Sequence, residues 1–263
     1  MGILNVTPDS FSDGGRFVSL DKALRQAERM LAEGADILDI GGESTRPGAD
    51  AVSLDEEMAR VLPVIERIDA ELDIPVSVDT SKPDLMRAAI AAGAGMINDV
   101  NALSAPGAIA AVADADVPVC LMHMLGEPRT MQAAPQYEDI VADIINYLGR
   151  RVAECEDGGI ARSRLLLDPG FGFGKTLNHN LVLLRDLGAL RALDLPLLVG
   201  ISRKSMLGAV TGRAVNERLI AGVAAAVMAV ERGARIVRVH DVAETVDALK
   251  IWQAVMDADT AEN

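Results

Sequence analysis

The segment PVSVDTSKPDLMRAAIAAGAGMINDV (75–100) contains one complete strand–helix–strand unit. Its two apolar runs flank a stretch of helical periodicity, which begins with capping hydroxyls followed by Pro83. Gly93 and Ala94 close that helix just before the second run, as left-handed helix caps tend to do. Asp79 ends the first run, and Asn98 stands near the end of the second. The segment therefore predicts parallel strands joined by a right-handed helical crossover.

The same unit recurs along the whole chain. Apolar runs lie at 3–6, 37–40, 75–79, 96–100, 118–122, 165–168, 195–201 and 236–240. Segments with helical periodicity cover 20–33, 55–71, 83–92, 106–115, 138–158, 178–192, 216–232 and 243–257. Strands alternating with helices in this way predict a single α/β domain over 1–258, a closed (β/α)8 TIM barrel, with a frayed tail at 259–263. In such barrels the carboxyl ends of the strands meet at one active site.

Composition limits the classes of function. The formal net charge of −14 argues against binding of nucleic acid, which needs a basic face, and against attraction to anionic membranes. The sequence shows no secretory signal segment and no apolar run of about 18 residues, so we expect a cytoplasmic protein. Cys120 and Cys155 form no CxxC pair, which favours reduced thiols that serve packing.

Two connections are longer and richer in glycine than a barrel needs. They cover 7–17 (TPDSFSDGGRF) and 43–53 (ESTRPGADAVS), and both follow the carboxyl ends of predicted strands. Long polar loops at this end of a barrel are typical of mobile lids over an active site. Ordinary solvated connections are the alternative interpretation.

The polar residues at the strand ends divide into two chemical sets. Side chains alternate along a strand, so Asp79, Arg238 and His240 should point into the barrel mouth while their valine neighbours face the helices. Asp79, Asn98 and Asp168 are acceptors, and together they suit a flat heterocycle with several N–H donors. For each of these residues a cap, a turn or an internal ion pair is the alternative. The turn is a specific rival at Asp168, which precedes a Pro-Gly pair.

The second set is cationic. Lys204 follows the seventh run, Arg238 and His240 lie on the eighth, and barrel phosphate sites are often built from the loops after strands seven and eight. A diphosphate or carboxylate would gain charge-assisted hydrogen bonds there. Arg46 on the second long loop could add to this set, whereas Arg203 is expected to point elsewhere.

Other polar residues suggest weaker interpretations. GFGFGKT (170–176) is a near miss to a phosphate-binding loop, and the histidines form no HxH or HExxH pair, so a zinc hydrolase is disfavoured. His123 is at least as consistent with a structural as with a catalytic role. We expect Asp39 to be buried and hydrogen-bonded to nearby loop amides.

These residues occur within motifs that resemble one family, the dihydropteroate synthases of bacterial folate synthesis. The resemblance runs along nearly the whole chain, in the same order, and its first two segments are highly specific. The segments are GILNVTPDSFSDGG (2–15), DIGGESTRPGA (39–49), SVDTSKP (77–83), INDV (97–100), LMHMLGEPRTMQ (121–132), LDPGFGFGK (167–175), GISRKS (200–205) and RVHDV (238–242).

The resemblance implies a transferase that condenses 6-hydroxymethyl-7,8-dihydropterin diphosphate with 4-aminobenzoate to give 7,8-dihydropteroate and diphosphate. It implies Mg²⁺-assisted departure of diphosphate, followed by attack of the amine on a cation stabilised by the pterin. Carried over by position, the pterin residues are Asp79, Ile97, Asn98, Met122, Asp168 and Lys204. Asn5 would help to hold Mg²⁺ on the diphosphate, which Arg238 and His240 would bind. Thr45, Arg46, Pro47, Phe173 and Ser205 would form the aminobenzoate side, where sulfonamides compete. Asn5, Thr45, Arg46, Lys204, Arg238 and His240 are the expected catalytic residues.

The resemblance also implies a homodimer and sensitivity to sulfonamides. Members of the family usually carry a short stretch before the MGILN segment, often a hairpin that covers the barrel bottom, and we expect this chain to lack it. Two rival functions stay open. A pterin-binding methyltransferase would keep the acceptors without needing the cations, and a catalytically silent homologue would only bind pterin or a protein partner.

Overall fold

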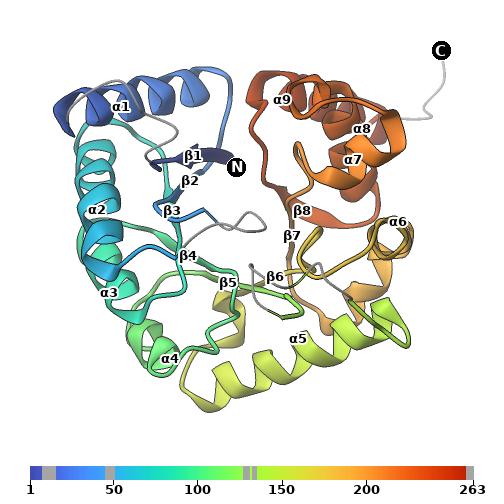
Figure 1. Cartoon of the computed structure of the whole chain (residues 1–263), viewed down its shortest axis with the longest axis horizontal. Coiled ribbons are helices and arrows are strands. Elements are labelled where there is room, and N and C mark those ends of the chain that lie inside the picture. Colours follow the sequence, from blue (N-terminus) through green and yellow to red (C-terminus); the bar gives the residue numbers. More distant parts are fainter. Residues whose placement is uncertain (8–15, 45–50, 127–130, 132–134, 259–263) are drawn as a thin grey trace.

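Short parallel strands form the centre of the computed structural model, which describes residues 1–7, 16–44, 51–126, 131 and 135–258 (Figure 1). They are β1 (Gly2–Asn5), β2 (Leu38–Gly41), β3 (Val76–Asp79), β4 (Met96–Asp99), β5 (Val119–Met122), β6 (Leu165–Asp168), β7 (Leu197–Val199) and β8 (Ala234–Val237). Strands that are consecutive in sequence pair side by side from β1 to β8. A parallel bridge between Gly2 and Val239 closes the sheet, and the Ile3 N–H donates to Val239 O at 2.9 Å. The predicted (β/α)8 barrel is confirmed.

Helices surround this barrel on its outside, as Figure 1 shows. They are α1 (Arg16–Ala32), α2 (Leu54–Glu71), α3 (Pro83–Ala91), α4 (Ala108–Val112), α5 (Ile140–Asp157), α6 (Leu177–Arg185), α7 (Ser205–Thr211), α8 (Leu219–Glu231) and α9 (Val242–Met256). Short 3₁₀ helices add η2 (Arg162–Arg164), η3 (Leu187–Leu193) and η4 (Val215–Glu217). Side-chain caps fix some starts: Ser53 Oγ accepts the Glu56 N–H before α2, and Asp139 Oδ1 accepts two N–H groups before α5.

Two helical segments differ from the sequence prediction. The stretch expected as one helix over 178–192 is divided into α6 and η3, because the α-helix ends at Asp186 and Gly188 follows within a turn. Helix α7 was not predicted, since it spans only seven residues before Gly212, at φ +71°, ends it. The expected tail at 259–263 and the segments 8–15 and 45–50 of the expected lids lie outside the described residues.

The barrel interior is filled in layers by the inward-facing side chains. Met1, Met96, Cys120 and Leu198 form a small apolar cluster there, separate from the main core between strands and helices. Because side chains alternate along a strand, the next inward residues after Met96, Cys120 and Leu198 lie one layer nearer the carboxyl ends. On β4 this next residue is Asn98, so the interior changes there from apolar to polar.

Both cysteines are free and buried, Cys120 inside the barrel and Cys155 in the main core, as the sequence predicted. None of the described helices is long and apolar enough to span a bilayer.

Candidate active site

The polar layer at the carboxyl end of the barrel is built by strand register. Asp79 on β3 is paired with Asn98 on β4, and Met122 on β5 is paired with Asp168 on β6. Paired residues in a parallel sheet present their side chains on the same face. Four of the expected pterin residues therefore line one continuous arc of the mouth, and this arc comes directly from the topology.

Arg238, just after β8, crosses the mouth to reach this arc. Its Nε donates to Asp39 Oδ2 at 2.5 Å, and its Nη2 donates to Asp79 Oδ2 at 2.8 Å. Asn98 Nδ2 also donates to Asp39 Oδ2, at 3.3 Å. These contacts link β2, β3, β4 and the β8 end into one hydrogen-bonded group. The cation expected on the diphosphate side is thus held by the acids of the acceptor side.

The expectation for Asp39 is only half right. Its side chain is fully buried, but its hydrogen-bond partners are the Arg238 and Asn98 side chains rather than loop amides. The reason is register: Asp39 lies inside β2, two residues before the strand ends at Gly41, so the loop amides are out of reach. Within the described residues its second oxygen, Oδ1, is buried without a partner.

Burial changes the proton affinities of two groups at the mouth. It raises the pKa of the Asp79 carboxyl to about 7, although Arg238 acts to lower it. It lowers the pKa of the Lys204 ammonium to about 8, although Asp168 acts to raise it. The mouth therefore holds one acid and one base whose pKa values lie close to neutral pH, which is typical of functional sites.

Asp168 serves the turn that follows β6. Its Oδ1 accepts the Gly170 N–H at 2.7 Å, which is the turn role that rivalled ligand binding. Its Oδ2 accepts no hydrogen bond from the residues that the structure describes, so one oxygen is left for a ligand. Burial raises the pKa of Asp168, while Lys204 and the Gly170 amide lower it. The two interpretations of Asp168 are therefore compatible.

Lys204 and Phe173 meet at the opposite side of the mouth. The Lys204 ammonium donates to Phe171 O and lies 4.4 Å from the centroid of the Phe173 ring. Ser205 follows as the exposed first residue of α7. Lys204, an expected pterin residue, therefore lies next to Phe173 and Ser205, two of the residues expected on the aminobenzoate side.

His240 and Asn5 stand at the ends of β8 and β1, where the barrel closes. Ser202 Oγ accepts the His240 N–H at 3.2 Å and lies 3.0 Å from His240 Nδ1. Asn5 Oδ1 is 3.6 Å from the position that a Cβ at Gly41 would occupy, so the absence of a side chain there leaves the amide accessible. The sequence assigned no role to Ser202, although its place just after β7 was the available signal.

The other expected residues are less central or not described. Ile97 is fully buried in the main core, on the face of β4 opposite Asn98. Met122 contacts the turn after β6, with its Cγ 3.3 Å from an ideal Cβ at Gly170. Thr45, Arg46 and Pro47 lie outside the described residues.

His123 and Lys175 form a buried pair beneath the β6–α6 loop, and His123 has the structural role. The Lys175 ammonium is 3.0 Å from His123 Nδ1 and donates to Gly170 O at 2.8 Å and Phe173 O at 3.0 Å. Burial lowers the pKa of His123 to about 3, with Lys175 acting in the same direction, so the ring is neutral and can accept. Lys175 was discounted in the sequence as part of a near-miss motif, yet it shapes the loop that presents Phe173.

A second, partly buried cluster anchors the stem of the second long loop. Lys82 donates to Glu43 Oε2 at 2.5 Å and also to Glu57, which is almost fully buried on α2. Glu43 Oε1 in turn accepts the Val52 N–H at 3.1 Å. The Glu43 carboxylate thus connects the residues before and after the segment that contains Thr45.

Comparison with known proteins agrees with this geometry. Residues 1–240 match the family described as pterin binding enzyme. A dihydropteroate synthase of Escherichia coli K12 is 53% identical over 258 residues, which cover 98% of this chain and 92% of that protein. A Xanthomonas albilineans dihydropteroate synthase with 4-aminobenzoic acid superposes with a TM-score of 0.93 at 55% identity, over 98% of this chain and 93% of the other. A Yersinia pestis dihydropteroate synthase in a sulfonamide complex gives 0.94 at 53% identity, over 98% and 94%.

The matched region covers nearly the whole chain and so spans the strand ends that build the mouth. The chain therefore belongs to the pterin-binding enzymes and, among them, to the dihydropteroate synthases.

Proposed function

We propose that this chain condenses 6-hydroxymethyl-7,8-dihydropterin diphosphate with 4-aminobenzoate to form 7,8-dihydropteroate and diphosphate. The observation that supports it most directly is the Asp39–Arg238–Asp79 group beside Asn98, in a chain of this family. It combines the acceptors that a pterin needs with a cation for the leaving diphosphate. The 4-aminobenzoic acid bound to the X. albilineans relative supports the second substrate.

The acceptor arc suits the pterin. Asp79, Asn98 and the unused oxygen of Asp168 would accept from the amino and lactam N–H groups of the ring. Lys204 would donate to the ring from the other side, and Met122 would contact its face. Because the Asp79 pKa is about 7, pterin N–H donors would favour the ionised carboxylate and lower that pKa on binding.

The diphosphate would lie over Asn5, Arg238 and His240. Two of the five guanidinium N–H groups of Arg238 are used by Asp39 and Asp79, so the others are available for phosphate oxygens. Since the acids already fix this guanidinium, it needs little rearrangement as negative charge develops on the leaving group.

Mg²⁺ fits this arrangement as an ion that is bound mainly by the diphosphate of the substrate. No cluster of three or more acidic, histidine or cysteine side chains that could hold a metal occurs among the described residues. Mg²⁺ commonly takes one or two protein oxygens together with substrate phosphates, and the accessible Asn5 amide oxygen beside Gly41 suits that role. When bound, the ion would neutralise charge on the departing diphosphate.

Departure of diphosphate leaves an exocyclic cation delocalised into the pterin, which the aniline nitrogen of aminobenzoate attacks. A weakly basic aromatic amine needs little deprotonation before attack, so no side chain need act as nucleophile or general base. Phe173 and Ser205, with Thr45, Arg46 and Pro47 of the second loop, would position the amine and exclude water that competes for the cation. Sulfonamides would compete for this side, as the complex of the Y. pestis relative supports.

We also propose a cytoplasmic homodimer. Exposed apolar side chains on consecutive elements support self-association: Val210 on α7 is 61% exposed, Val215 on η4 49% and Ile220 on α8 81%. Sedimentation of the wild type and of Ile220→Glu tests this, because a charge in a dimer interface should shift the variant toward monomer. A wild type that sediments as a monomer at micromolar concentration would refute it.

A coupled assay of diphosphate release tests the catalytic proposal. The expected result is release that requires both aminobenzoate and Mg²⁺ and yields dihydropteroate in equal amount. A methyltransferase or a silent homologue would give no such release. Release that continues without aminobenzoate would contradict the condensation.

A further inference from the structure

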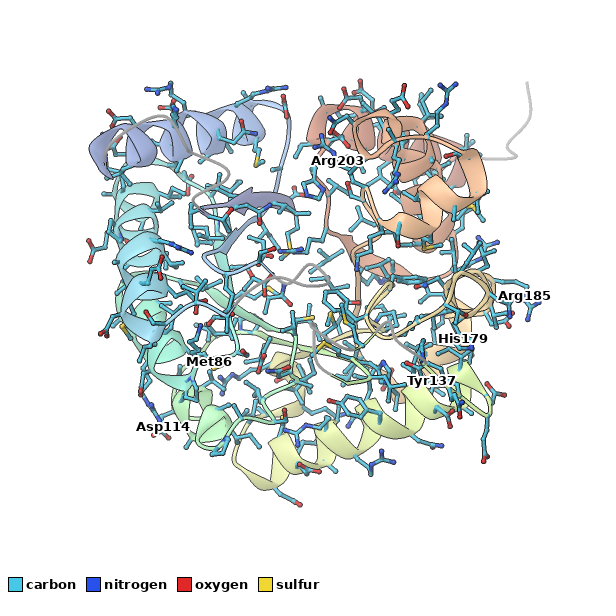
Figure 2. All side chains as sticks on the ribbon, viewed as in Figure 1. Met86, Asp114, Tyr137, His179, Arg185 and Arg203 are labelled. Atoms are coloured by element: carbon cyan, nitrogen blue, oxygen red, sulfur yellow. The ribbon has the colours of Figure 1, made fainter. Side chains whose placement is uncertain are left out.

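A cationic pocket lies where the first and last units of the barrel meet. We call it the seam pocket; it is lined by Lys22, Arg25 and Arg29 of α1 and by Arg203, and Asn5 and His240 also belong to its lining. Its volume is about 560 Å³, enough for a small anion with its hydration. Figure 1 shows α1 and α9 next to each other at the top of the ring, and Figure 2 labels Arg203 in the same region.

The cations of α1 form one face of the helix. Lys22, Arg25 and Arg29 are spaced i, i+3 and i+7, which places them in a row on the same side. At 1.5 Å of rise per residue the row is about 10 Å long. That length exceeds a single phosphate group. The row therefore extends along α1 and could contact more than one phosphate group.

The charge of the pocket is opposite to that of the protein. The chain carries a formal −14, yet no aspartate or glutamate is among the described residues that line the pocket. Arg29 pairs with Glu33 at 2.6 Å and Arg203 pairs with Asp241, whereas Lys22 and Arg25 have no ion-pair or hydrogen-bond partner within the described chain. Unpaired cations in a cleft raise the local concentration of anions and attract them at short range.

We propose that the seam pocket is a second anion site, one that binds a diphosphate group through Lys22, Arg25 and Arg203. Diphosphate is the favoured class because the lining of the pocket includes Asn5 and His240, which the proposed function assigns to the substrate's diphosphate. The inference rests on that function for its biological meaning, but not for the binding itself. The group bound there is either the incoming substrate's diphosphate or the diphosphate that leaves.

Titration calorimetry with inorganic diphosphate and Mg²⁺, in the absence of both organic substrates, tests the site. The variant is Lys22→Gln with Arg25→Gln. The matched control is Arg150→Gln with Lys250→Gln, which removes one arginine and one lysine from exposed positions on α5 and α9 and so changes the net charge equally. We expect diphosphate affinity to fall roughly tenfold in the seam variant at low ionic strength, because two cations that face the anion are removed, and to stay unchanged in the control. The difference should shrink in about 0.5 M salt, where the screening length is only a few ångströms.

Equal affinities in the two double variants would overturn the proposal, provided that circular dichroism shows both to be folded. Kinetics then separates the two sources of the anion. A lower kcat/KM for the pterin diphosphate would show that the site binds the incoming substrate. Weaker product inhibition by diphosphate, with kcat/KM unchanged, would show that it binds the leaving diphosphate. No change in either quantity would contradict the site. If the protein shows no turnover but its diphosphate binding still depends on Lys22 and Arg25, the proposed function is refuted and the anion site is supported.

Discussion

Replacement of Arg238 and Asp39, singly and together, tests whether the buried ion group holds the mouth together. Arg238 makes two charge-assisted hydrogen bonds, to Asp39 and Asp79, and its side chain is only 20% exposed. Such bonds contribute about 1.5–3 kcal/mol each, and removing one partner of a buried pair costs about 3–5 kcal/mol. We therefore expect Arg238→Met to lower the free energy of unfolding by about 3–5 kcal/mol, because Asp39 would stay buried without its cation.

Asp39→Asn should cost less, about 2 kcal/mol, because the amide keeps the shape and can still contact Asn98. In the double variant no charge is left unpaired at Asp39, and Asp79, with its pKa of about 7, can take up a proton. The double variant should therefore be about 2–3 kcal/mol more stable than the sum of the two single losses predicts.

Urea unfolding of all four proteins, followed by circular dichroism and by fluorescence, measures this coupling. The exposed pair Arg185–Asp186, whose arginine Figure 2 labels, is the control, and its neutralisation should leave the urea midpoint unchanged. Additive losses, within about 0.5 kcal/mol, would show that Arg238 and Asp39 do not interact in the folded protein and would refute the assignment.

Four further outcomes are expected. The kcat/KM for the pterin substrate should fall below about pH 7, where Asp79 takes up a proton, and above about pH 8, where Lys204 loses one; a flat profile between pH 6 and 9 would contradict both assignments. Asp79→Ala should abolish activity while the far-ultraviolet circular dichroism is kept, whereas loss of fold would indicate a purely structural role. Gly170→Ala should lower the free energy of unfolding by about 3 kcal/mol or more, because its Cβ would lie 1.9 Å from His123 O at φ +69°; an unchanged melting temperature would refute this. Lys175→Met should cost about 2–4 kcal/mol in urea unfolding, since three buried acceptors lose their donor.

The fold could be predicted from the sequence because two periodicities alternate without interruption. Strands of three or four residues are too short to show much internal pattern, but most of them are flanked by helices long enough to be recognised. The prediction was weakest where a helix is short. Helix α7 follows β7 after a single turn and spans only seven residues, which is below the length at which helical periodicity becomes distinct.

The acceptors of the site could be predicted for a similar reason. Asp79 and Asp168 end apolar runs, and strand ends converge in a parallel barrel. Lys175 could not be assigned in this way. Its partners are the Gly170 and Phe173 carbonyls and the His123 ring, and the path of a glycine-rich loop around a buried ammonium is not encoded in any periodicity.

Asp39 shows why pairing across a barrel is harder to predict than placement around it. Alternation places Asp39 inside the barrel, but its partner Arg238 is 199 residues away in sequence, and only closure of β8 against β1 brings them together. Once they are joined, the acceptor and cationic sides of the mouth cease to be independent. Any change that displaces Arg238 from the diphosphate also removes the counter-charge of Asp79, so variants aimed at one substrate group should alter the binding of the pterin ring as well.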